Sequence, residues 1–341
     1  MNFNLYLENL VEKKELPGGV LYVQQGNTYE FIKAYGSFTD QEGQVQQVTT
    51  DTLFDLASLT KVVATLPSIL FLIGKRELSL EDSVQKIIPS LRFKHITIRH
   101  LLHHNSGLPA DLPYRNRFES RDVLSDVLSE DLIYSTEEKV VYSDLGMILL
   151  GKIVEEISGE PLNEFTRKNI FEPWQLNNTT YLPSKEHIDQ IASTEKVGDT
   201  YVQGEVHDEK AFHLGGVGGS AGVFSTAQDI GLYSKYWLGL EEQNVIPESL
   251  IELAQKDIFK HRGLRFEVLV EENQDISCGN KWPIGTFGHN GFTGTSVWMD
   301  PEHQLSVAFL TNIVHYGRDH KMKEIRQTLH SKIFEEIVLA K

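Results

Sequence analysis

The stretch that most constrains this chain is residues 54–73, FDLASLTKVVATLPSILFLI. The mostly apolar run after Lys61 predicts the start of a buried helix, and Ser58 and Lys61, three residues apart, would share one face of it. A serine in the first turn lies beside unpaired N–H groups and the positive end of the helix dipole. A lysine among apolar residues is pushed toward its neutral form. A hydroxyl beside such an amine is a nucleophile with its base, although S-x-x-K also occurs by chance and Ser58 could be only a helix cap.

The composition of the chain is that of a globular protein and argues against several kinds of partner. The chain has 341 residues, 40% hydrophobic and 23% charged, which is typical of a globular protein of one large domain or two closely joined ones. Its net charge of −16 argues against nucleic acid or an anionic membrane as a partner. The single cysteine, Cys278, excludes an internal disulfide and is compatible with the cytosol.

The N-terminus has neither the basic region nor the continuous apolar region of a secretory signal. The apolar run after Lys61 is short for a bilayer span and contains Pro67. We therefore expect a soluble cytoplasmic protein, unless a leader has been removed.

Strand patterns occur at both ends of the chain and helical patterns in its middle. Residues 20–23 and 29–35 predict a hairpin, and further strands are expected at 264–270, 284–289, 295–299 and 305–311. Helices are expected at 3–14, from 79, from 97 to near 105–109, at 119–129, 145–157, 161–171 and 321–339, and a loop at 40–52. This order predicts an α/β (α+β) fold, with an antiparallel sheet built from both chain ends, flanked by helices and carrying an inserted helical region. We expect a sheet domain of residues 1–60 and 225–341, a helical domain of residues 61–224, and an active site between them.

A glycine-rich segment, GGVGGSAG, occupies residues 215–222. It has neither the Gly-Lys-Ser/Thr ending of a P-loop nor dinucleotide-binding spacing, so we expect close backbone packing near a site instead. The following residues 225–228, STAQ, fit a capping box at a helix start. His103 and His104 lack a His-Glu-x-x-His frame, so we expect no zinc site there.

Two further clusters carry reactive groups. Residues 140–146, VVYSDLG, place the phenol of Tyr142 and the carboxylate of Asp144 where a loop meets a helix. Residues 288–295, GHNGFTGT, lie at a strand edge, where glycines allow a substrate backbone to approach. Simpler interpretations are that Tyr142 is a core phenol, that Asp144 caps the following helix, and that His289 only bonds a neighbouring strand.

The three clusters, in this order, resemble the serine β-lactamase and penicillin-binding-protein superfamily, whose related S-x-x-K, S-D-N and K-T-G set is well established. The class C β-lactamase branch, with its esterases and D-peptidases, is the most similar. The resemblance covers nearly the whole chain and includes LLHHNSGL at residues 101–108 and the glycine-rich segment. It implies a β-lactamase/transpeptidase-like fold.

The resemblance also implies roles for single residues. Ser58 would be the acylated nucleophile, Lys61 would help to deprotonate it, and Tyr142 would relay the proton to the leaving group. His289, Asn290 and Gly291 would lie on the substrate side, where K-T-G is found. The backbone N–H groups of Ser58 and Phe292 would form an oxyanion hole, in which each donor contributes about 3 kcal/mol. Such enzymes need no cofactor and no metal.

Two departures from the family pattern affect the expected chemistry. Asp144 stands where asparagine is usual. An anion near Lys61 favours the charged form of the lysine, which makes Lys61 a poorer base, so that Tyr142 would act as the main base. A register shifted by one would instead make Ser143-Asp144-Leu145 an altered S-D-N. His289 replaces lysine, and neutral imidazole holds a carboxylate weakly, which puts penicillin hydrolysis in doubt.

We therefore predict a serine hydrolase that cleaves a small ester, amide or peptide through an acyl-enzyme, of carboxylesterase or D-amino-acid peptidase type. The alternatives are a true β-lactamase and a binding protein that kept the fold but lost the chemistry.

Overall fold

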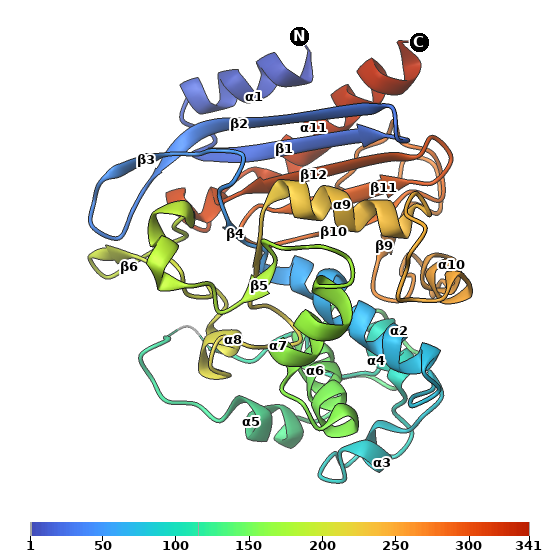
Figure 1. The fold of residues 1–341 in the computed structure, drawn as a ribbon. Coiled ribbons are helices and arrows are strands. Elements are labelled where there is room, and N and C mark those ends of the chain that lie inside the picture. Colours follow the sequence, from blue (N-terminus) through green and yellow to red (C-terminus); the bar gives the residue numbers. More distant parts are fainter. Residues whose placement is uncertain (1, 115, 341) are drawn as a thin grey trace.

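The computed structural model describes residues 2–114 and 116–340. Its main sheet has seven antiparallel strands in the order β3-β2-β1-β12-β11-β10-β9 (Figure 1). The strands from the two chain ends meet where β1 pairs with β12, in a register that runs from Gly19 opposite Thr311 to Gln25 opposite Leu305. The predicted antiparallel sheet built from both ends of the chain is therefore confirmed. The seven strands are β1 (Gly18–Gln25), β2 (Tyr29–Thr39), β3 (Val45–Gln47), β9 (Glu267–Val268), β10 (Phe287–Asn290), β11 (Ser296–Asp300) and β12 (Leu305–Thr311).

Helices cover both faces of this sheet. Helix α1 (Phe3–Glu12) and helix α11 (Met322–Phe334), which continues as η6 (Glu335–Leu339), lie on one face, and α9 (Ala227–Trp237) lies on the other (Figure 1). Side chains alternate between the faces of a strand. Leu21 and Val23 accordingly pack in the cluster under α1 and α11, while Val20 and Tyr22 pack in the cluster under α9.

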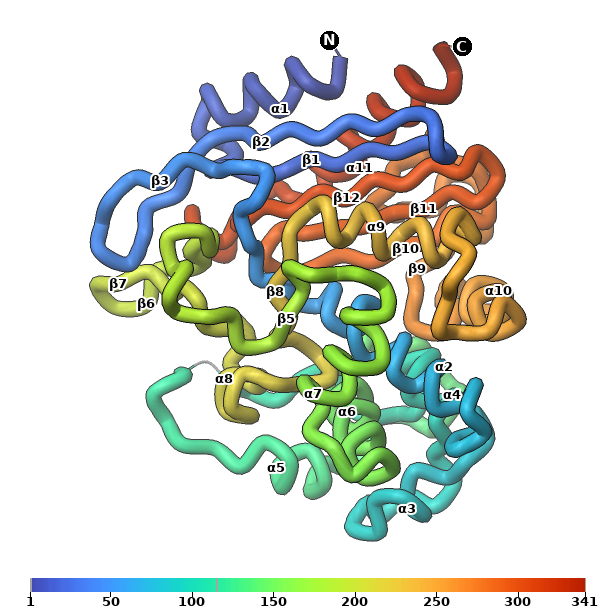
Figure 2. Tube along the Cα trace, viewed as in Figure 1, coloured from blue at the N-terminus to red at the C-terminus, as the bar shows by residue number. Residues whose placement is uncertain are grey.

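The middle of the chain forms a helical region on the α9 side of the sheet (Figure 2). Its centre is α6 (Asp144–Ser158), which α2, α3, α4, α5 and α7 contact. These helices are α2 (Leu66–Gly74), α3 (Val84–Ile87), α4 (Ile98–Leu102), α5 (Val123–Ser129) and α7 (Leu162–Thr166), the last continuing as η3 (Arg167–Phe171). The remaining helical elements are η1 (Ala57–Leu59), η2 (Lys61–Thr65), η4 (Lys185–Gln190), α8 (Glu209–His213), α10 (Glu248–Lys256) and η5 (Ile313–Tyr316). The remaining strands form a small sheet of β4 (Phe54–Asp55), β8 (Val223–Ser225) and β5 (Thr180–Tyr181), and the pair β6 (Lys196–Val197) and β7 (Thr200–Tyr201).

Several predicted boundaries are wrong. The expected loop at 40–52 contains strand β3, which pairs with the end of β2. The strands expected at 264–270 and 284–289 shrink to β9 and β10, because Arg265 and Gly285 have φ angles of +79° and +96°, which a continuous strand does not accept. The helix expected from residue 79 begins only at Val84. Thr226, rather than Ser225, caps α9.

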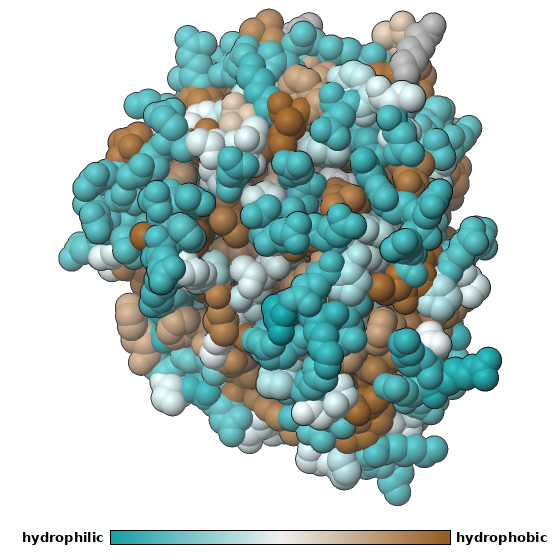
Figure 3. All heavy atoms as spheres, viewed as in Figure 1, coloured by the Kyte–Doolittle hydropathy of each residue, from teal (hydrophilic) through white to brown (hydrophobic). Residues whose placement is uncertain are grey.

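The helical stretch from Ala57 to Gly74 contains the apolar run after Lys61 that we expected to be short for a bilayer span. By length and composition alone its 18 residues could cross a membrane, but 78% of the stretch is buried inside the fold. Pro67 lies inside this stretch, just after the point where the segment η2 (Lys61–Thr65) passes into α2. The surface seen in Figure 3 is largely hydrophilic, with hydrophobic side chains in scattered groups.

Candidate active site

Ser58 lies in a short 3-10 turn, η1 (Ala57–Leu59), directly after β4. The preceding residue, Ala57, has a φ of +46°, a conformation that costs a residue with a side chain about 1–3 kcal/mol. The Ala57 N–H donates to Oδ1 of Asp55 at 2.8 Å, and that carboxylate is fully buried. The turn is therefore held in a strained shape that presents Ser58, which is half-buried.

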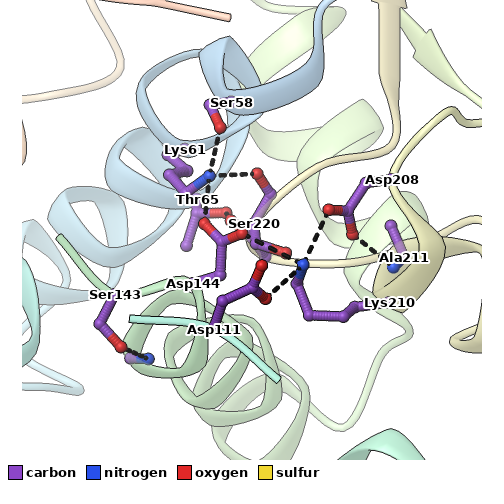
Figure 4. Close-up of polar contacts among 12 residues, drawn as sticks. Ser58, Lys61, Thr65, Asp111, Ser143, Asp144, Asp208, Lys210, Ala211 and Ser220 are labelled. Atoms are coloured by element: carbon purple, nitrogen blue, oxygen red, sulfur yellow. Dashed lines mark hydrogen bonds and ion pairs between the residues drawn. The ribbon is translucent and has the colours of Figure 1, made fainter. Parts of the chain in front are cut away.

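Lys61 is completely buried, and its ammonium contacts three acceptors (Figure 4). Nζ lies 2.7 Å from Oγ of Ser58, 2.8 Å from the carbonyl oxygen of Ser220 and 2.8 Å from Oδ1 of Asp144. Three acceptors match the three hydrogens of an ammonium group. The apolar surroundings expected from the sequence are thus only part of the environment of Lys61.

Tyr142 lies between two cations. Nζ of Lys61 is 5.3 Å from the centroid of its ring, and Cζ of Arg265 is 4.7 Å away. Burial raises the pKa of the phenol, but Lys61 and Arg265 outweigh it, with a smaller contribution from the Ser58 hydroxyl, so that the pKa falls below its usual value of 10. The phenolate is therefore easier to form here than in water.

The start of α6 decides between the two possible registers of this motif. The N-cap of the helix is Ser143, whose Oγ accepts from the N–H of Gly146 and donates to the carbonyl of Pro109 at 2.6 Å. Asp144 is therefore not the cap, contrary to the simpler interpretation, and its carboxylate binds Lys61. The side chains at the site are those of Tyr142 and Asp144, and the hydroxyl of Ser143 is bonded to Pro109 instead.

The segment around His104 supports the Tyr142 loop. The carbonyl of His104 accepts from the N–H of Val141 at 2.8 Å, and its Nδ1 accepts from the N–H of Ser143 at 3.0 Å. The imidazole also packs 4.8 Å from the Tyr142 ring. Within residues 2–114 and 116–340 no group of three or more His, Cys, Asp or Glu side chains is placed to hold a metal ion.

His289 is buried, with its ring centroid 6.0 Å from that of Tyr142. Its Nε2 lies 3.0 Å from Nη2 of Arg265, and its Nδ1 lies 2.8 Å from the carbonyl oxygen of Asn290. An arginine can only donate, so Nε2 is the acceptor and Nδ1–H the donor. Burial, together with Arg265, holds the pKa of His289 well below its usual value, which keeps the imidazole neutral.

Arg265 is the residue that the sequence analysis missed. It lies just before β9, is completely buried, and is tied to α4 by its N–H, which donates to the carbonyl of Leu102. Burial lowers the pKa of Arg265 to about 10, which leaves it charged at neutral pH. The available signal was a charged residue in the apolar run LRFEVLV, the same signal that drew attention to Lys61.

The loop after β10 is fixed against the Ser58 turn. The hydroxyls of Thr293 and Thr295 donate to the carbonyls of Asp55 and Leu56, at 2.7 and 3.0 Å. A Cβ on Gly291 would lie 2.4 Å from the Leu56 oxygen, so this glycine lets the loop pack against the protein's own Ser58 turn, and the predicted approach of a substrate backbone stays a prediction. The backbones of the two expected oxyanion donors, Ser58 and Phe292, thus belong to segments that are bonded together.

Two of the candidate side chains have contacts with residues other than the nucleophile. The amide of Asn290 accepts from the indole N–H of Trp298 at 3.3 Å, on the opposite face of β10 from His289. Phe292 is 49% exposed, and its ring stacks on His207 at 5.8 Å. For Phe292 only the backbone remains a candidate, and Asn290 contributes its carbonyl, which orients His289.

The glycine-rich segment packs closely beside the site, as predicted. A Cβ on Gly219 would lie 2.1 Å from the carbonyl oxygen of Met147 in α6. The carbonyl of Gly219 accepts from Thr65, and that of Ser220 accepts from Lys61. The segment therefore supplies an acceptor for the lysine.

A family model described as "Beta-lactamase" matches residues 3–332. The chain belongs to the β-lactamase family. Its members are serine hydrolases, so the predicted resemblance, fold and enzyme class are all confirmed.

Within the β-lactamase family, the chain is 31% identical to the N-acetylmuramyl-L-alanine amidase of Bacillus subtilis (strain 168), over 88% of this chain and 78% of that protein. It is also 31% identical, over 88% of this chain and 79% of the other, to a protein of Escherichia coli (strain K12) provisionally named a D-alanyl-D-alanine carboxypeptidase. Its fold is similar to that of a class C β-lactamase from Rhodobacter sphaeroides, with a TM-score of 0.78, 20% identity, and coverage of 98% of this chain and 99% of that one.

Proposed function

We propose that this β-lactamase family protein hydrolyses esters or D-amino-acid peptide amides through an acyl-enzyme on Ser58. The observation that carries the proposal is the 2.7 Å contact between Oγ of Ser58 and Nζ of Lys61, beside a tyrosine whose pKa is lowered. A hydroxyl in contact with a cation and beside an easily formed phenolate is an activated nucleophile.

In the proposed reaction the Tyr142 phenolate, held by Lys61 and Arg265, takes the proton of Ser58 while Oγ attacks the substrate carbonyl. The backbone N–H groups of Ser58 and Phe292 hold the oxyanion that forms. Tyr142 then gives its proton to the leaving alcohol or amine. A water molecule, deprotonated in the same way, attacks the acyl-enzyme and releases the acid, which restores Ser58.

The state of His289 favours esters and amides over penicillins. Both of its ring nitrogens are already bonded, Nε2 to Arg265 and Nδ1 to the carbonyl of Asn290. The imidazole therefore has no N–H left to give to a penicillin carboxylate. The names of the amidase and carboxypeptidase relatives support a peptide of the bacterial wall as the substrate class.

A covalent probe tests the nucleophile. A fluorophosphonate should add to Ser58, as seen by mass spectrometry of the digested protein, and p-nitrophenyl acetate should be hydrolysed. Ser58→Ala should abolish both. Ser68→Ala is the matched control on the same helical stretch, because the Ser68 hydroxyl only bonds the Ala64 carbonyl.

The substrate class is tested by turnover of a peptide ending in D-Ala-D-Ala, measured as released D-alanine, against turnover of nitrocefin. We expect a higher kcat/KM for the peptide or the ester. Faster nitrocefin hydrolysis would favour the true β-lactamase. If the wild-type protein gives no adduct on Ser58 but binds the peptide, and Ser58→Ala binds it equally well, the binding-protein alternative is correct.

A further inference from the structure

Lys210 is a second buried lysine next to the site, and it contacts three carboxylates (Figure 4). Its Nζ lies 2.7 Å from Oδ1 of Asp111, 3.0 Å from Oδ2 of Asp208 and 3.4 Å from Oδ2 of Asp144. Asp208 is also the N-cap of α8, because its other oxygen accepts from the N–H of Ala211 at 2.8 Å. The ammonium of Lys210 therefore lies at a fixed place.

Asp144 lies between the two lysines. Its Oδ1 is 2.8 Å from Nζ of Lys61, and its Oδ2 is 3.4 Å from Nζ of Lys210. Burial raises the pKa of Asp144, but the two lysines outweigh burial and leave the pKa below its usual value. The carboxylate is therefore ionised, and each of its oxygens contacts one of the two lysines.

The family pattern has a neutral asparagine at the position of Asp144. A carboxylate has nearly the shape of a carboxamide but adds one negative charge, and Lys210 adds one positive charge on the side away from Ser58. We infer that Lys210 is a positioning residue that neutralises Asp144, so that the Asp144–Lys210 pair together takes the place of the asparagine. This inference rests on the proposed function.

The consequence of losing Lys210 follows from the charges that would remain. The full charge of Asp144 would act on Tyr142 and favour its protonated form, because Asp144 already raises the pKa of this phenol. Asp111 and Asp208 would lose their contacts with Lys210 as well. The other groups that face Lys61 and Tyr142 do not oppose this change, because Arg262 and Arg265 are cations in either case and His104 and His289 are held neutral by burial.

A double-mutant cycle tests this role. The kcat/KM for p-nitrophenyl acetate is measured across pH for the wild type, Lys210→Met, Asp144→Asn and the double variant. We expect Lys210→Met to move the acidic limb of the profile up by about one pH unit, which lowers kcat/KM on that limb about tenfold. The double variant removes both charges, so its acidic limb should return to the wild-type position and its kcat/KM should exceed that of Lys210→Met.

Two controls separate charge from structure. Lys210→Arg keeps the charge and should keep the wild-type limb. Lys152→Met removes a half-buried lysine of α6 that pairs only with Glu155 and Glu156, and should leave the profile unchanged.

The inference is overturned if the acidic limb of Lys210→Met stays at the wild-type position, or if the limb of the double variant stays with that of Lys210→Met. If Lys210→Met does not fold, as judged by its thermal unfolding, Asp144→Asn carries the test. Its acidic limb should lie below that of the wild type, and an unchanged limb overturns the inference. Normal turnover and Ser58 labelling in the wild type show that the proposed function holds whatever the cycle gives, whereas a wild type without turnover overturns both.

Discussion

At the scale of single residues, the site consists of charged side chains of both signs packed near the hydroxyl of Ser58. Lys61 bonds Ser58 and Asp144, and the guanidinium of Arg265 contacts the ring of Tyr142. The pattern of the family has a lysine where this chain has His289. Here a positive charge is provided by Arg265, whose Nη2 donates to Nε2 of His289.

Replacing Arg265 by methionine should raise the pKa of Tyr142, because one of the two cations that lower it is removed. The phenolate would then form only at higher pH, so we expect the acidic limb of kcat/KM for p-nitrophenyl acetate to move up by about one unit. Arg92→Met, which removes an exposed surface arginine, is the control. An acidic limb that stays in place would show that Arg265 does not act on the phenol.

At the scale of elements, each reactive group is placed by a contact between segments far apart in the chain. The Ser58 turn is bonded to the loop after β10, and Arg326 of α11 donates to the carbonyls of Gly291 and Thr295 in that loop, at 2.7 and 2.9 Å. Burial lowers the pKa of Arg326 to about 9. A buried charge persists only where it is bonded, so this arginine fixes the loop that carries Phe292.

The glycine-rich segment offers a test at this scale. Gly219→Ala would place a Cβ 2.1 Å from the carbonyl oxygen of Met147, so the segment must move, at a cost of about 1–3 kcal/mol in stability. The carbonyl of Ser220 would leave Lys61. Esterase activity should therefore fall even at temperatures where the variant is still fully folded, as judged by its melting temperature.

Gly146→Ala in α6 is the matched control, since its Cβ would meet Leu101 at an ordinary 3.5 Å. Equal activities of the two variants would show that the packing of the segment does not matter to the site.

At the scale of the whole molecule, the main sheet joins the two ends of the chain, because β1 pairs with β12. The buried apolar side chains of the C-terminal helix pack on the face that also carries α1. The predicted division into domains 1–60 with 225–341 and 61–224, and the predicted cytoplasmic location, both stay predictions. Fractionation of the cells that make the protein would test the location.

Removing residues 322–341 should abolish cooperative unfolding. Each buried side chain of the type lost, such as Leu329 or Ile333, contributes about 1.5–3 kcal/mol, and several are lost together, while a whole domain is stable by only about 5–15 kcal/mol. Circular dichroism during heating would show this. Removing only residues 339–341 should change little, because Leu339 is 62% exposed, and a sharp transition in the longer truncation would contradict the expectation.

Most of the fold and the reactive core could be predicted from the sequence. Period-two and helical patterns are local, and so are the spacings of Ser58 with Lys61 and of Tyr142 with Asp144. Boundaries failed where a single residue with positive φ, such as Arg265, interrupts an apolar run that reads as a strand, because the cost of that conformation is offset by contacts elsewhere in the molecule.

The amino-acid sequence alone determined which groups could react and in which order they lie along the chain. Only the tertiary structure decided which charges surround them. Arg265 reaches Tyr142 and His289, and Lys210 reaches Asp144, across long separations in the sequence. Electrostatic fields depend on distance in space and on burial, and neither quantity is written in the local pattern of residues.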